Sequence, residues 1–119
     1  MSDEFIALAT KEINEELLEF GRLLLECKNE DDVYSNSEKF QKHTHKIKGL
    51  APMMGKEELG NFSGDLDFVF KKIIDGNKID NVFDLLNDSV ALMQNSMSDS
   101  ETNFLDVKNR LSQIFNDLN

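Results

Sequence analysis

Apolar side chains recur at steps of three and four residues along almost the whole chain, and only one proline, Pro52, interrupts the pattern. Such steps place side chains on one face of an α-helix, whereas a half-buried strand needs strict alternation, which no segment keeps up. An amphipathic helix must bury its apolar face against a neighbour. The pattern therefore predicts an all-α fold, an antiparallel helical bundle, and the 119 residues suit a single domain spanning 1–119.

Five amphipathic segments are expected. The first covers about residues 3–27, and residues 28–31 have the composition of a turn. The second carries its apolar stripe over residues 40–54 and ends at Gly55. The third begins near Glu57 and ends at the pair Gly76-Asn77, and the fourth carries its stripe over residues 79–97.

The last segment starts with a helix-capping signal. Ser98 and Glu101 have the Ser-x-x-Glu spacing of a capping box, so a fifth, C-terminal helix is predicted to begin there. Its inward positions are Phe104, Val107, Leu111, Ile114 and Leu118.

Charge and cysteine content exclude several classes of function. The chain has 13 basic and 23 acidic residues, a net charge of −10, which would repel a phosphate backbone, so nucleic acid is not an expected partner. No run of about 18 apolar residues exists, and residues 1–9 lack the pattern of a signal peptide, so a cytoplasmic protein without membrane insertion is expected. Cys27 is the single cysteine, which excludes an internal disulfide and a cysteine-based zinc motif.

The two histidines, His43 and His45, can be separated by helical geometry. At two residues apart they lie roughly 200° apart around one helix, which does not suit a shared metal ion. Relative to the inward stripe through Phe40, Ile47 and Ala51, His43 falls at the margin and His45 points outward.

The outward face of this helix combines three features beside His45. Lys48 lies at i+3, Gly49 at i+4 and Pro52 at i+7. A glycine within a helix costs about 1 kcal/mol relative to alanine, and here it leaves open space next to the imidazole. A neutral imidazole is a nucleophile that needs no separate deprotonation, and a lysine can neutralise phosphoryl oxygens. The alternative is an ordinary exposed histidine beside a lysine.

The motif His45-x-x-Lys48-Gly49, followed by Gly55, resembles that of histidine-containing phosphotransfer (HPt) domains. The order of helices is similar to the phosphotransfer domain of CheA-type chemotaxis histidine kinases over nearly the whole chain. The resemblance implies a four-helix core plus a fifth C-terminal helix. It also implies a phosphoryl carrier: the histidine is phosphorylated by a histidine kinase ATP-binding domain and passes the group to an aspartate of a CheY- or CheB-like response-regulator receiver domain.

The resemblance assigns roles residue by residue. His45 would be the phosphoacceptor, Lys48 the cation at the phosphoryl group, and Gly49 the neighbour that leaves space. Asp67 stands where such domains carry a glutamate that accepts a hydrogen bond from the other imidazole nitrogen, and it is one methylene shorter. Its alternative is an ordinary surface aspartate. A second departure is Gly64, where some CheA-type domains carry another histidine.

No nucleotide-binding loop or Mg²⁺-binding carboxylate cluster is legible, so ATP and Mg²⁺ are expected on the partner domains, with no cofactor in this one. The domain alone would then be a substrate of the kinase. A different possibility is a helical adaptor or inhibitor that binds a kinase or receiver without being phosphorylated. An enzyme with His45 as general base is disfavoured because no paired carboxylate or substrate pocket is legible. Whether the domain stands alone or belongs to a longer kinase stays open.

Overall fold

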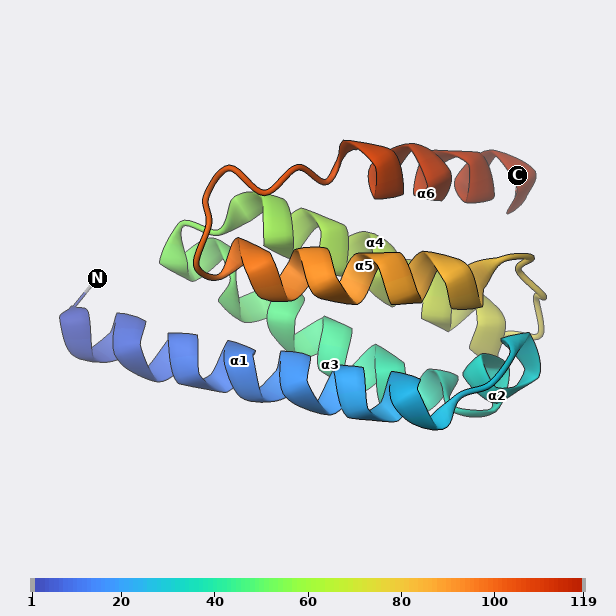
Figure 1. The fold of residues 1–119 in the computed structure, drawn as a ribbon, viewed down its shortest axis with the longest axis horizontal. Coiled ribbons are helices and arrows are strands. Elements are labelled where there is room, and N and C mark those ends of the chain that lie inside the picture. The colour runs from blue at the N-terminus through green and yellow to red at the C-terminus, as the bar shows by residue number, and fades with distance from the viewer. Residues whose placement is uncertain (1, 119) are drawn as a thin grey trace.

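The chain folds as a bundle of antiparallel helices, and the predicted all-α class is confirmed. The computed structural model describes residues 2–118, in which it has six α-helices, one turn of 3-10 helix and no strand. Successive long helices run in opposite directions (Figure 1). Their bounds are α1 Asp3–Glu26, α2 Glu30–Ser35, α3 Ser37–Leu50, η1 Pro52–Met54, α4 Glu57–Ile74, α5 Val82–Ser96 and α6 Leu105–Leu118.

Three phenylalanines join the helices that carry the predicted motif to the rest of the bundle. Phe20 of α1, Phe40 of α3 and Phe70 of α4 are fully buried. The ring of Phe40 lies 5.0 Å from that of Phe20 and 5.3 Å from that of Phe70, within the range of favourable aromatic pairs. This cluster holds α3 firmly between its neighbours, so its outer face has a defined orientation.

A short helix replaces part of the turn expected at residues 28–31. The side chain of Asn29 accepts a hydrogen bond from the Asp32 amide at 3.0 Å and so caps α2. Val33 is fully buried, and the Tyr34 hydroxyl donates to the Ile79 carbonyl at 2.9 Å while accepting from the Ile79 amide at 3.0 Å. Turn-forming residues here initiate a helix that tertiary contacts stabilise.

The capping box predicted at Ser98 is wrong. The Ser98 hydroxyl donates to the Asn95 carbonyl, and the Glu101 amide bonds to Asp99 Oδ1 at 2.9 Å. Helix α6 begins only at Leu105, whose amide bonds to Asn103 Oδ1 at 2.8 Å. The capping box would have used the amides of Glu101 and Ser98, but the Asp99 carboxylate accepts from the first and the Asn95 carbonyl accepts from the second.

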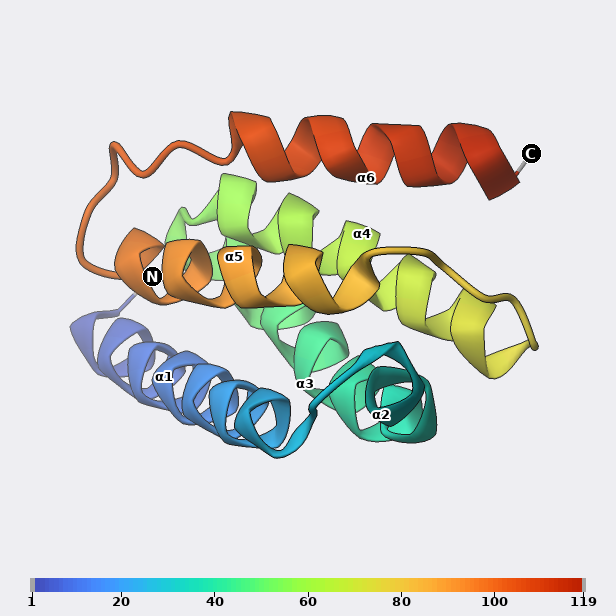
Figure 2. The same cartoon turned by 45° about the vertical axis from the view of Figure 1, so that its right-hand side comes forward.

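Helix α6 lies over α4 and α5 (Figure 2). Phe104, just before it, packs against Phe62 of α4 with ring centroids 5.2 Å apart. Phe115 meets Phe68 of α4 edge to face at 5.4 Å. These contacts attach the C-terminal helix to α4. Within residues 2–118, no helix has the length and apolar character needed to cross a membrane.

Helix α3 ends just before the proline. The Ala51 amide still bonds to the Ile47 carbonyl at 2.9 Å, and Pro52 then starts the 3-10 turn η1. Gly55 closes this turn with a left-handed φ of 80°, as expected of a C-terminal glycine. The proline ring packs so closely on α4 that a Cβ added to Gly60 would lie 2.6 Å from Pro52 Cγ.

Candidate functional site

The two histidines of α3 have different surroundings. His43 is half-buried, with 22% of its side chain exposed, and its Nδ1 lies 3.0 Å from Glu16 Oε1 of α1. His45 has 61% of its side chain exposed and points away from α1 toward the α4 side of the helix. Helical phase separates these histidines as the sequence predicts: His43 ties α3 to α1, and His45 is available to a partner.

Asp67 of α4 lies beside His45 but is not a surface aspartate. Only 2% of its side chain is exposed, and its Oδ1 lies 3.6 Å from His45 Nδ1. This separation is beyond hydrogen-bond length, so the pair is close without being bonded. The other oxygen, Oδ2, lies 3.9 Å from Lys48 Nζ. The tertiary structure thus brings His45, Lys48 and Asp67 to one spot on the α3–α4 surface.

Sequence reasoning missed two further groups at this spot. Gln41 Nε2 donates a hydrogen bond to Asp67 Oδ1 at 2.6 Å, and Lys71 Nζ lies 3.1 Å from Asp67 Oδ2. A signal existed, because Gln41 is four residues before His45 and Lys71 four residues after Asp67, which places each on the same helix face as its neighbour.

The Asp67 carboxyl is held in its ionised form. Burial by itself would raise its pKa, but hydrogen bonds from Gln41 and Lys71, together with the positive charge of Lys71 and that of His45 in its protonated form, lower the pKa below its ordinary value. A buried carboxylate with this many donors is well satisfied. The imidazole of His45 therefore faces a fixed negative charge on one side and solvent on the other.

The glycines near His45 have distinct spatial roles. A Cβ added to Gly49 would meet nothing within 4 Å, so the surface next to the imidazole is open there. A Cβ added to Gly64 would lie 3.5 Å from Lys48 Cδ and 3.6 Å from its Cγ. Gly64 thus leaves room for the stem of Lys48 as it crosses α4 toward Asp67.

Local charge on α3 is opposite to that of the chain. The helix carries one acidic residue, Glu38, and four lysines: Lys39, Lys42, Lys46 and Lys48. The chain as a whole has a net charge of −10. A positive helix on an acidic protein favours the approach of negatively charged groups to this surface in particular.

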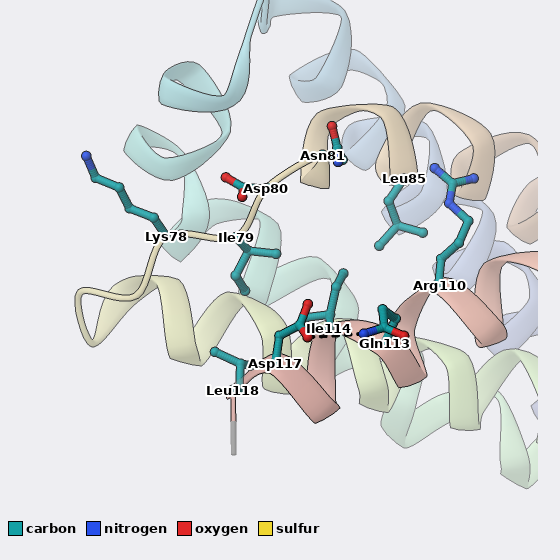
Figure 3. A pocket seen from close by; sticks show the side chains of 10 residues that line it. All are labelled: Lys78, Ile79, Asp80, Asn81, Leu85, Arg110, Gln113, Ile114, Asp117 and Leu118. Carbon is teal, nitrogen blue, oxygen red and sulfur yellow. Dashed lines mark hydrogen bonds between the residues drawn. The ribbon is translucent and has the colours of Figure 1, made fainter.

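A pocket between the α4–α5 loop and α6 lies away from His45. It encloses about 440 Å³ between the loop at Lys78–Asn81, the start of α5 and helix α6, and none of its lining residues surrounds His45 (Figure 3). Its guanidinium, Arg110, is already paired with Asp88 at 2.7 Å and with Asp106 at 3.4 Å. The site at His45 is an exposed surface site and not a cavity.

Among residues 2–118, no group of three or more His, Cys, Asp or Glu side chains is arranged to hold a metal ion. Comparison of the chain with models of protein families, with curated proteins and with solved structures finds no match. Function is therefore inferred from the chemistry of the side chains around His45.

Proposed function

We propose that this chain is a phosphoryl carrier in two-component signal transduction, with His45 as the phosphoacceptor. The observation that carries the proposal is an exposed imidazole whose Nδ1 lies 3.6 Å from a buried, ionised carboxylate, Asp67, at a surface left open by Gly49. This combination suits a nucleophile that must reach large partners.

The carboxylate defines which imidazole nitrogen would react. Asp67 favours a proton on the nearer nitrogen, Nδ1, and this leaves the lone pair of Nε2 directed away from the carboxylate. In the first transfer, Nε2 of His45 attacks the γ-phosphorus of ATP, the bond to the ADP oxygen breaks, and a nitrogen–phosphorus bond forms. In the second, a partner's aspartate oxygen attacks phosphorus and the nitrogen–phosphorus bond breaks, which returns the imidazole.

Two lysines would supply positive charge to these steps. Lys48 lies one turn after His45 on α3 and has half of its side chain exposed, and Lys71 of α4 is similarly exposed. The ammonium groups of both lysines lie near the Asp67 carboxylate. A flexible lysine can turn from a carboxylate toward an incoming phosphoryl group. The positive charge of α3 adds to their effect.

The partners are those that the resemblance to HPt domains implies. A histidine kinase ATP-binding domain of the CheA type would donate the group, and a CheY- or CheB-like receiver domain would accept it. ATP and Mg²⁺ would be bound by those partners, and all of them would meet in the cytoplasm. The domain itself would bring no catalysis beyond presenting a reactive imidazole.

The test is phosphorylation by a CheA-type ATP-binding domain with labelled ATP. We expect an acid-labile, alkali-stable phosphoryl group that His45→Gln abolishes. His43→Gln is the matched control on the same helix, and it should still be labelled. Labelling that persists in His45→Gln would refute the assignment. Receiver binding that survives His45→Ala without any phosphotransfer would instead favour a helical adaptor.

A further inference from the structure

The side chains of Gln41 and His45 both lie close to the same oxygen atom, Asp67 Oδ1. They lie four residues apart on α3 and therefore share a face of the helix. Gln41 Nε2 donates to Asp67 Oδ1 at 2.6 Å, and His45 Nδ1 lies 3.6 Å from that oxygen. The amide of Gln41 is thus hydrogen-bonded to the oxygen atom that would determine the tautomer of the His45 imidazole.

The second oxygen of Asp67 is drawn toward cations. Lys71 Nζ lies 3.1 Å from Oδ2 on the same helix, and Lys48 Nζ lies 3.9 Å from it. The terminal torsion of an aspartate is soft, so the carboxylate can rotate about it to improve contact with these lysines. Within residues 2–118, the only hydrogen bond to Oδ1 comes from Gln41, and it opposes such a rotation.

We infer that Gln41 is a positioning residue that holds Asp67 Oδ1 beside His45 Nδ1 and thereby favours the imidazole tautomer with its proton on Nδ1. The inference deepens the proposed function and rests on it for its consequence, a free Nε2 nucleophile. The tautomer itself is a property of the folded protein and can be measured without any phosphotransfer.

An amide suits this task better than a charged donor. It fixes the orientation of the carboxylate through a short hydrogen bond and adds no net charge at the interface of α3 and α4. A further ammonium group at Gln41 would compete with His45 for the negative charge of Asp67. The neutral donor therefore supports the shorter aspartate and leaves its charge directed at the imidazole.

The test replaces Gln41 by methionine, which keeps an unbranched stem and removes the donor. We expect ¹⁵N NMR at alkaline pH to show a smaller fraction of His45 with its proton on Nδ1. The rate of phosphorylation should fall by about threefold to tenfold, as for loss of one hydrogen bond of ordinary strength. Gln113→Met is the matched control, because Gln113 Nε2 also donates to an aspartate, Asp117, at 3.1 Å on α6.

The effect must act through Asp67. In the Asp67→Asn background, Gln41→Met should cause no further change in the tautomer fraction. An unchanged or larger Nδ1-protonated fraction in Gln41→Met would overturn the inference, and so would an equal change in the Asp67→Asn background. If circular dichroism shows that Gln41→Met is unfolded, Gln41→Leu takes its place.

The two proposals fail in different ways. A tautomer change in a protein that no kinase phosphorylates would leave the positioning role of Gln41 standing and refute the carrier function. Normal phosphorylation of His45, together with an unchanged tautomer in Gln41→Met, would leave the carrier function standing and refute the positioning role of Gln41.

Discussion

Replacing Gly60 with alanine should destabilise the fold, although alanine is the better helix former. The new Cβ would lie 2.6 Å from Pro52 Cγ and 2.7 Å from Pro52 Cδ, far inside the optimum of about 3.5–4.0 Å for carbon atoms. A proline ring cannot rotate away from the contact. Overpacking of this kind costs about 2–3 kcal/mol, and the gain in helix propensity is about 1 kcal/mol. The net loss in free energy of unfolding is therefore about 1–2 kcal/mol.

Gly64, one turn later on α4, is the matched control. A Cβ there would lie 3.5 Å from Lys48 Cδ, an ordinary van der Waals contact with a flexible side chain. Gly64→Ala should therefore keep the benefit of helix propensity and stabilise the protein by about 0.5–1 kcal/mol. The same substitution on the same helix is predicted to act with opposite sign at the two positions.

Urea denaturation followed by far-UV circular dichroism measures both effects. The Pro52→Ala background isolates the cause, because it removes Cγ and Cδ while the Pro52 nitrogen, at 3.5 Å from the added Cβ, stays in ordinary contact. Gly60→Ala should no longer destabilise in that background. A Gly60→Ala protein as stable as the wild type would refute the reasoning.

Four further predictions concern the site and the stability of the fold. Gly49→Leu should leave the urea midpoint nearly unchanged, because the space is open, but should slow phosphorylation of the neighbouring imidazole at least tenfold. Burial raises the pKa of Asp65, so acidification should stabilise the wild type relative to Asp65→Asn. The pKa of Asp67 is lower in the folded protein than its ordinary value of 3.8, so the ionised carboxylate should stabilise the fold above pH 3.8. This contribution to the free energy of unfolding should be lost as the pH falls through the folded pKa. In acid unfolding titrations, the difference in stability between the wild type and Asp67→Asn should therefore disappear. Tyr34→Phe should cost about 1–3 kcal/mol in urea denaturation, because both backbone groups of Ile79 lose a partner.

The limits of prediction from sequence are visible at particular residues. Periodicity located the long helices, since apolar steps of three and four report directly on the face that must be buried. The start of α6 could not be read this way. Ser98, Asp99 and Asn103 are all good capping residues, and only the path of the chain from α5 to α6 decides which backbone group each one meets.

The sequence by itself determined the helical class and the outward phase of His45, with Lys48 and Gly49 on its face. These follow from the fixed rotation per residue of a helix. Only the tertiary structure decided what lies opposite the imidazole. Asp67 could have been a surface aspartate, but packing of α4 on α3 buries it within 3.6 Å of His45 Nδ1 and adds the amide of Gln41. The physical reason is that contacts between helices depend on their relative placement, which helical periodicity alone does not specify.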